Sequence, residues 1–327
     1  MDILEKFLRE KEKPLKKHNR RYFKTAGITV CVESDLDFDK IKFISKFDTF
    51  AVEGPGEDNV TLRHSFYLPQ FNYSDLGEKV YHNAPWIIYR KDGYWIYLCF
   101  VKEETRENVY KIAVFNKDHT EGVIFNNPDI KDNLYKEGFF SLAFFPTDQI
   151  WIAPLLADRN AFYLHSSASI INGKGLIFVG HSEAGKSTTL KMLKGNAEIL
   201  CDDRNILRRW ENGWQVHGTW SHGEIPDVSS SSAPLRAVCI LTKNKSNRLE
   251  LVTDNMEIWK LLLVTLVKPL VSVEWWQKEL DVLEMLVKEV PVYRMYFDKS
   301  GEIVEILKDS LFQSNNEPEI IKGHKQA

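Results

Sequence analysis

The stretch Gly180-His-Ser-Glu-Ala-Gly-Lys-Ser187 decides the fold of this chain. It matches the pattern GxxxxGK[ST] of a phosphate-binding loop. The apolar, β-prone residues 176–179 precede it, and a helix-like run that ends at Gly195 follows it. The alternative is a glycine turn that joins a strand to a helix and binds nothing. Because strand, glycines, lysine and serine all fall in register, the sequence favours the phosphate-binding loop.

The residue types of this loop suit a nucleotide phosphate. Gly180 and Gly185 let the backbone bend close to an anion, so that amide groups and the positive end of the helix dipole point at phosphate oxygens. Lys186 adds a charge near the β- and γ-phosphates, and Ser187 offers a hydroxyl ligand for Mg²⁺. The predicted cofactors are therefore ATP and Mg²⁺. The predicted nucleotide-binding residues are Gly180, His181, Ser182, Glu183, Ala184, Gly185, Lys186, Ser187 and Thr188.

Composition limits the possible functions and locations. With 327 residues the chain is long enough for about two domains, and its net charge of -3 provides no general attraction for nucleic acid. Its four cysteines lie far apart without a CxxC pair, which argues against a zinc site and a disulfide framework. The N-terminus is charged, and the most apolar run, residues 261–267, is too short to cross a bilayer. We expect a cytoplasmic protein that binds neither nucleic acid nor membrane, and a homo-oligomer remains open.

The predicted fold class is α/β, with a P-loop kinase domain and an N-terminal β-rich α+β domain. Residues 1–155 begin with a short helix that ends at Pro14 and continue with aromatic and β-branched runs between turns, such as the hairpin turn Asp92-Gly93. This half is expected to be largely antiparallel sheet, for recognition or scaffolding. The catalytic domain is expected over residues 156–311, and the polar tail 312–327 is expected to be disordered.

The C-terminal part of the catalytic domain has its own pattern. A strand is expected near residues 236–243, followed by a turn with Lys243, Lys245 and Arg248, one of which could reach a phosphate. A helical stretch over residues 254–290 is interrupted near Pro269, and a last strand follows it.

His165 is predicted to lie at the mouth of the loop. Asn172-Gly173 is a strong two-residue hairpin turn, so the strand before it pairs antiparallel with the loop strand. Pairing outward from this turn places His165 opposite Gly180. A lone strand histidine is usually a core or surface residue. Its position here makes His165 a candidate for contact with the phosphate or the substrate.

Asp202 and Asp203 follow the short, largely apolar strand expected over residues 197–201 and are the candidate acidic residues. The carboxyl end of a strand beside a phosphate loop is where open α/β sheets bind ligands. Adjacent residues point to opposite faces of a strand, so one carboxylate can serve Mg²⁺ while the other accepts the proton of an attacking hydroxyl. Both are catalytic candidates with His165 and Lys186, and Asp203 is also a candidate metal ligand. An ordinary solvated turn is the alternative.

A second hairpin is predicted at Asn212-Gly213. Pairing outward from this turn places His222 opposite Asp203 and Glu224 opposite Cys201, if no bulge intervenes. Glu224 is therefore a candidate second metal ligand beside Ser187 and Asp203, and His222 is a candidate contact to the phosphate or the substrate.

Three motifs together, the hairpin with His165, the loop GHSEAGKST and the acidic pair in ILCDDR, resemble the catalytic domain of HPr kinase/phosphorylase and its distant relatives, the ATP-dependent phosphoenolpyruvate carboxykinases. The resemblance covers roughly residues 156–245. It implies a loop that binds nucleotide phosphates, a serine and a glutamate that serve the metal, and an aspartate pair for the metal and the proton of a serine hydroxyl. These roles fall on Lys186, Ser187, Glu224, Asp202 and Asp203, and His165 matches a histidine near the transferred phosphate.

The chain also departs from that family. The EIRGLG-type signature is missing, and GTWSHGE followed by DVSSSSAPLR occupies its place. The chain is thus more similar to divergent HPr-kinase-related proteins, some of which phosphorylate a serine on a small peptide made alongside them. This resemblance implies an ATP-dependent kinase that acts on a serine of a small protein or precursor peptide. A small-molecule kinase and a noncatalytic nucleotide-sensing module are the alternatives.

Overall fold

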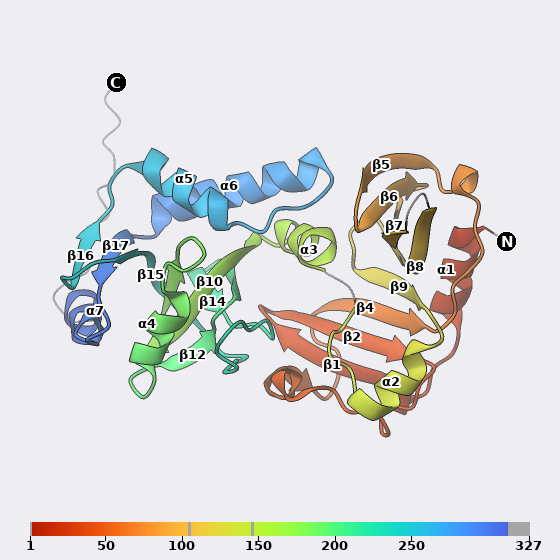
Figure 1. Cartoon of the computed structure of the whole chain (residues 1–327), viewed down its shortest axis with the longest axis horizontal. Helices are drawn as coiled ribbons and strands as arrows, with labels where there is room; N and C mark the ends of the chain where they lie inside the picture. The colour runs from red at the N-terminus through yellow and green to blue at the C-terminus, as the bar shows by residue number, and fades with distance from the viewer. Residues whose placement is uncertain (1, 104–105, 145–146, 313–327) are drawn as a thin grey trace. The chain divides into compact units, whose positions relative to one another are not determined.

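The computed structural model describes residues 2–103, 106–144 and 147–312 and divides the chain into two compact units (Figure 1). Unit 1 comprises residues 1–161 and 267–279, and unit 2 comprises residues 162–266 and 280–327. This division differs from a single border at residue 155, because a segment late in the sequence returns to unit 1. Each unit contains one large mixed sheet, so the chain is a mixed α/β protein. The predicted disordered tail, apart from residue 312, lies outside the described residues.

Unit 1 contains a nine-stranded sheet with the order β3-β1-β2-β4-β9-β8-β7-β6-β5. The hairpin expected at Asp92-Gly93 is confirmed, because Lys91 pairs with Tyr94 and both turn residues have positive φ. Two neighbouring pairs, β2–β4 and β4–β9, are parallel, so the sheet is mixed. The strands are β1 Arg20–Thr25, β2 Ile28–Ser34, β3 Ala51–Val52, β4 Asp58–Ser65, β5 Glu78–Asn83, β6 Trp86–Lys91, β7 Tyr94–Glu103, β8 Arg106–Phe115 and β9 Glu121–Asn126.

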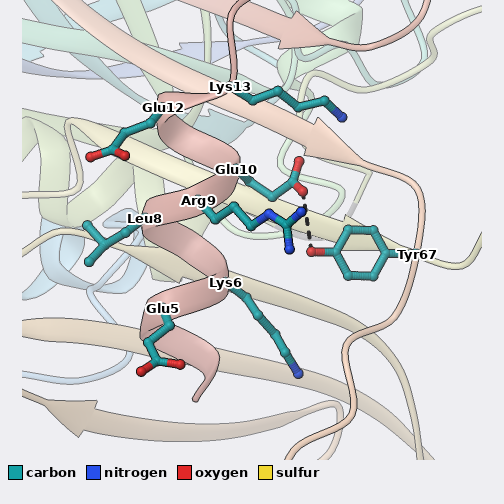
Figure 2. A pocket seen from close by; sticks show the side chains of 8 residues that line it. All are labelled: Glu5, Lys6, Leu8, Arg9, Glu10, Glu12, Lys13 and Tyr67. Atoms are coloured by element: carbon teal, nitrogen blue, oxygen red, sulfur yellow. Dashed lines mark hydrogen bonds between the residues drawn. The ribbon is translucent and has the colours of Figure 1, made fainter. Parts of the chain in front are cut away.

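The N-terminal helix α1, Ile3–Glu12, packs on the unit 1 sheet. Asp2 and Glu5 form a capping box at its start. Ile3, Leu4 and Phe7 are buried, whereas Leu8 is 42% exposed. On the outer side of α1 an open pocket extends to Tyr67, whose hydroxyl donates to Glu10 (Figure 2). Unit 1 also contains the helices α2 Ile130–Glu137 and α3 Ala153–Ala157, the short 3-10 helices η1 Lys17–Asn19, η2 Ser45–Phe50 and η3 Tyr73–Asp75, and the short π-helix η4 Asp148–Ile152.

Unit 2 contains an eight-stranded sheet in which the loop strand β11 lies between antiparallel β10 and parallel β15. The strands are β10 Ala161–Ile171, β11 Lys174–Val179, β12 Glu198–Cys201, β13 Arg204–Trp210, β14 Gly213–His217, β15 Ser232–Lys243, β16 Arg248–Leu251 and β17 Val292–Phe297. The helices are α4 Lys186–Leu193, α5 Asn255–Thr265 and α7 Ile303–Phe312, and α6 Val273–Glu289 continues from unit 1. The break expected near Pro269 is confirmed, whereas α7 was not predicted.

One face of the unit 2 sheet is covered by α4 and α7. Leu176 and Phe178 of β11 share a buried cluster with Leu190 of α4 and Leu307 of α7. Because side chains alternate along a strand, Ile177 and Val179 belong to the opposite face. This packing holds the loop between β11 and α4 at the carboxyl ends of the parallel strands β11, β15 and β17.

The two predicted hairpins of unit 2 have different outcomes. The first is confirmed, since Ile171 pairs with Lys174 and the register continues to Ser166 and Val179. The second prediction was wrong, because the turn is shifted by one residue. Its central residues are Glu211 and Asn212, and Trp210 pairs with Gly213. Gly213, with a φ of 110°, uses its conformational freedom in the first position of the return strand rather than inside the turn.

The corrected register removes the two pairings inferred from the second hairpin. β13 begins at Arg204 and β14 ends at His217, so His222 does not pair with Asp203 and Glu224 does not pair with Cys201. Residues 218–231 form an irregular connection to β15.

Two further properties concern membrane segments and cysteines. Across the described ranges, no helix has both the length and the apolar character needed to cross a membrane. All four cysteines are free and buried.

Candidate active site

The predicted phosphate-binding loop is a tight turn between β11 and α4. Gly185 has a φ of 107°, and a Cβ on it would lie 2.7 Å from Cζ of Phe297. A Cβ on Gly180 would lie 2.6 Å from Cβ of Ala184. Both positions therefore require glycine for steric reasons. Of the other predicted loop residues, Ala184 is buried, Thr188 is half-buried, and His181, Ser182 and Glu183 are exposed.

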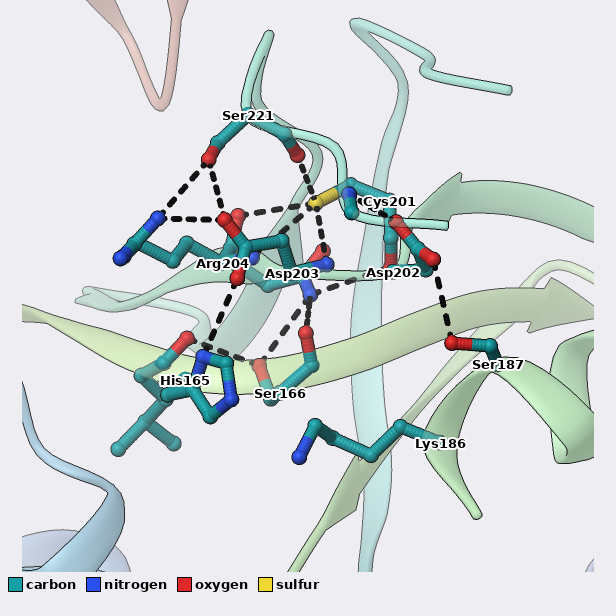
Figure 3. A network of polar contacts seen from close by, with 12 residues as sticks. His165, Ser166, Lys186, Ser187, Cys201, Asp202, Asp203, Arg204 and Ser221 are labelled. Atoms are coloured by element: carbon teal, nitrogen blue, oxygen red, sulfur yellow. Dashed lines mark hydrogen bonds and ion pairs between the residues drawn. The ribbon is translucent and has the colours of Figure 1, made fainter. Parts of the chain in front are cut away.

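Lys186 lies across the loop. Its ammonium group donates to the carbonyl oxygens of Gly180 at 3.0 Å and His181 at 3.3 Å. Burial lowers the pKa of Lys186, and the charges of Asp203 and Asp202 oppose that shift. The charges of both carboxylates therefore act on the lysine. Figure 3 shows Lys186 with the two aspartates and Ser187 in one view.

Asp202 lies next to Ser187 and is held firmly (Figure 3). The Ser187 hydroxyl donates to Oδ2 of Asp202 at 3.3 Å. The backbone N–H groups of Gly223 and Ile225 donate to Oδ1 at 2.5 Å and to Oδ2 at 2.7 Å. The carboxylate is 4% exposed, so its position beside the first turn of α4 is fixed by the connection that follows β14.

Asp203 has a different set of neighbours. Its Oδ1 lies 3.2 Å from Nδ1 of His165, and its Oδ2 accepts a hydrogen bond from the Ser221 hydroxyl at 2.8 Å and from Arg204. Burial tends to raise the pKa of Asp203, but the hydrogen bond with His165, the charge of Arg204 and the Ser221 hydroxyl lower it to about 2. Asp203 is therefore ionised at neutral pH, beside a histidine whose side chain is 44% exposed.

The structure brings Lys186, Ser187, Asp202, Asp203 and His165 together. The candidate metal ligands from the sequence were Ser187, Asp203 and Glu224. Asp202, rather than Asp203, is the aspartate next to Ser187. Glu224 is exposed and forms an ion pair of 2.6 Å with Lys191. The hydrogen bond with Lys191 lowers the pKa of Glu224, and a smaller effect of the same sign comes from Ser187, so Glu224 lies near that hydroxyl. His222 is exposed, and its Nδ1 lies 3.3 Å from the carbonyl oxygen of Gly223.

Sequence reasoning missed the groups that hold the acidic pair. The backbone N–H of Ser166 donates to the carbonyl of Asp203 at 2.9 Å, and Asn205 donates to the carbonyl of Ser166 at 2.9 Å. Asn205 and Ser221 do not belong to any recognisable sequence motif. The hydrogen bonds of a single polar residue depend on how strands far apart in the sequence pair, which the sequence does not show. Arg204 follows the acidic pair directly, and its proximity could have been anticipated.

The residues around Ser187 fit a magnesium ion that takes most of its ligands from phosphate and water. Among the described residues, no group of three or more His, Cys, Asp or Glu side chains is arranged to hold a metal. Mg²⁺ is usually bound through one or two protein oxygens, with phosphate oxygens and water completing its shell. A hydroxyl and a fixed carboxylate 3.3 Å apart meet that requirement.

Comparisons with known proteins give a weak structural match. No protein-family model matches the chain, and no curated protein matches it. Among solved structures, the HPr(Ser) kinase/phosphatase from Coxiella burnetii is similar with a TM-score of 0.27 and 12% sequence identity, over 45% of this chain and 94% of that chain. A TM-score this low does not assign a role to any residue.

Proposed function

We propose that the chain is an ATP-dependent phosphotransferase that transfers the γ-phosphoryl group to a hydroxyl, with a serine of a small protein or precursor peptide as the acceptor. The observation that supports this proposal is that two carboxylates with different neighbours lie beside the phosphate-binding loop. Asp202 lies beside Ser187, whereas Asp203 lies beside His165. A kinase needs both kinds of group, one for the metal and one for the proton of the attacking hydroxyl.

The residues of the chain take separate parts in this proposal. Lys186 and the backbone N–H groups of the loop bind and orient the phosphates. Ser187 and Asp202 would hold Mg²⁺, with Glu224 close enough to contribute through water. When bound, the ion would neutralise charge on the phosphates. Ser221 and Arg204 orient Asp203 through Oδ2, which leaves Oδ1 directed at His165.

The Asp203–His165 pair is the proposed proton acceptor. Because Asp203 has a pKa of about 2, it is a weak base at neutral pH and serves mainly to orient and stabilise a charged imidazole. His165 donates from Nδ1 to Asp203, so that Nε2 can accept the proton of the serine hydroxyl. In this arrangement the hydroxyl is the nucleophile, the imidazole is the base, and the carboxylate orients the base.

Mass spectrometry of candidate acceptors is the direct test. The purified protein is incubated with Mg²⁺-ATP and a set of serine-containing peptides, each paired with the same peptide carrying alanine in place of serine. We expect a phosphate-sized mass gain on a serine peptide only, and none with the Lys186→Met variant. Transfer to free serine or another metabolite would replace the peptide acceptor with a small molecule. Tight nucleotide binding without transfer, unchanged by Asp203→Asn, would contradict a kinase.

A further inference from the structure

A cavity of about 580 Å³ lies against the first half of the phosphate-binding loop. Its remaining walls come from the carboxyl end of β15, from β17 and from the last turns of α5, all in unit 2. Its lining includes Thr242, Lys243, Leu261, Val264, Thr265 and Arg294. Lys243 is one of the three cations that the sequence offered as a possible phosphate contact, and the other five residues were not predicted to bind phosphate or to carry the chemistry.

The strand order places this cavity on one side of the loop and the Asp203–His165 pair on the other. β11 has β10, which carries His165, as one neighbour and β15 as the other. Val179, the last residue of β11, pairs with Ser166 on one side and Ile240 on the other. A phosphate chain bound over the loop can therefore point its γ end toward β10 and its other end toward β15. Ligands of open α/β sheets bind at such carboxyl ends of parallel strands.

The α5 wall of the cavity is apolar. Val264 is 77% exposed and Leu261 is half-buried, although both line the cavity. The hydroxyl of Thr265 donates to the carbonyl of Leu262 at 2.9 Å, so it is already satisfied within the helix. An apolar surface of this kind gains free energy when a flat aromatic group covers it.

Two cations line the cavity, Arg294 within β17 and Lys243 at the end of β15. Arg294 of β17 forms an ion pair with Glu257 of α5, which fixes the guanidinium at the edge of the cavity. The side chain of Lys243 reaches back to the loop, since its Cε would lie 3.7 Å from a Cβ on Gly185. Lys243 is exposed, so its charge is free to reorient toward an anion at the loop.

We propose that this cavity binds the nucleoside of the nucleotide, with the base against Leu261 and Val264 and with Lys243 beside the phosphate nearest the ribose. The inference rests on the proposed function, because it needs the phosphates to occupy the loop. The volume lies within the range of small-ligand sites, about 300–1,000 Å³. The acceptor is the other possible occupant, but its hydroxyl must reach the Asp203–His165 pair on the far side of β11.

Comparing ATP with inorganic tripolyphosphate tests the assignment. Tripolyphosphate can use the loop but has no nucleoside. The test variant is Val264→Gln/Leu261→Gln, which replaces the apolar wall without adding charge. The matched control is Met256→Gln/Leu251→Gln, because Met256 on α5 and Leu251 on β16 are also exposed, at 63% and 55%, but do not line the cavity. Dissociation constants are measured by calorimetry with Mg²⁺ present, and circular dichroism checks that each variant is folded.

We expect the test variant to bind ATP about tenfold more weakly and tripolyphosphate as the wild type does, and the control variant to keep both affinities. Equal weakening of both ligands, or no effect on ATP, would overturn the nucleoside assignment while leaving the proposed kinase function standing. An unchanged affinity for ATP with a raised KM for the acceptor would assign the cavity to the acceptor instead. Failure of the wild type to bind either ligand would overturn the proposed function, and this inference with it.

Discussion

Asp202 and Asp203 are adjacent in the chain but have separate surroundings, and their amide variants should therefore differ. Asp202→Asn removes a charge beside Ser187, so we expect the Mg²⁺ concentration for half-maximal rate to rise about tenfold. Asp203→Asn removes the partner of His165, so we expect kcat to fall about 10²-fold or more at saturating Mg²⁺. Phosphoryl transfer measured over a range of Mg²⁺ concentrations separates the two effects.

Asp227→Asn is the matched control for both variants. Asp227 belongs to the same connection after β14, but it forms a surface ion pair with Lys194 at 3.1 Å. Its variant should keep both the rate and the Mg²⁺ dependence, since exposed ion pairs contribute little. If the effects of Asp202→Asn and Asp203→Asn were exchanged, the proposed division of roles would be reversed.

Glu279 on α6 makes stability depend on pH. Its side chain is 0% exposed, neither carboxyl oxygen has a hydrogen-bond partner, and burial raises its pKa from 4.5 to about 9. Between these values the unfolded chain loses a proton that the folded chain keeps, so stability is complete below about pH 4.5 and is lost as the pH rises toward 9. The expected slope is about 1.4 kcal/mol per pH unit.

Glu279→Gln should remove most of this slope, because a neutral amide does not ionise in either state. The measurement is the free energy of unfolding in urea at several pH values between 5 and 8. Glu284→Gln on the same helix is the control, since Glu284 is 51% exposed and its variant should keep the slope of the wild type. A slope that persists in Glu279→Gln would show that another group causes it.

At the scale of elements, the phosphate-binding loop depends on a glycine that combines positive φ with close packing. Gly185→Ala should lower stability by about 1–3 kcal/mol and greatly weaken ATP binding, because the new Cβ would meet Phe297. Gly195→Ala is the control: Gly195 also has positive φ, at 90°, but open space around it. We expect it to cost about 1 kcal/mol and to keep ATP affinity. Calorimetric melting and ATP titration of both variants provide the comparison, and equal losses of ATP affinity would argue against a role for loop packing.

The two hairpins show how far sequence reasoning reaches. Asn172-Gly173 occupies the two central turn positions, so its register follows from residue type alone. Asn212-Gly213 has the same two residues but is shifted by one position, because Gly213 opens the return strand. The approach of residues 221–225 to the acidic pair was expected from a wrong pairing and arises instead from hydrogen bonds such as Gly223 to Asp202. Local patterns predict elements, whereas the groups that orient a side chain depend on contacts between distant segments.

At the scale of the whole chain, residues 267–279 return to unit 1 after unit 2 has begun, which no local pattern indicates. Trp275 provides the clearest contact of this segment. Its ring lies 5.1 Å from that of Trp95 and 4.9 Å from that of His119, and its indole N–H donates to Asp158 at 3.3 Å. The integrity of unit 1 should therefore depend on a residue far along the sequence.

Trp275→Ala should destabilise unit 1 by about 3–5 kcal/mol, because a tryptophan that is 5% exposed leaves a cavity and an unpaired Asp158 oxygen. Hydrogen exchange followed by mass spectrometry can resolve this loss by segment. We expect β6, β7 and β8 to lose protection, and β11 and β15 of unit 2 to change less. Trp276→Ala is the matched control, since its half-buried ring contacts the Lys268 ammonium at 5.6 Å. If both variants lowered protection equally in the two units, the return segment would not be a specific part of unit 1, and stability would be shared evenly along the chain.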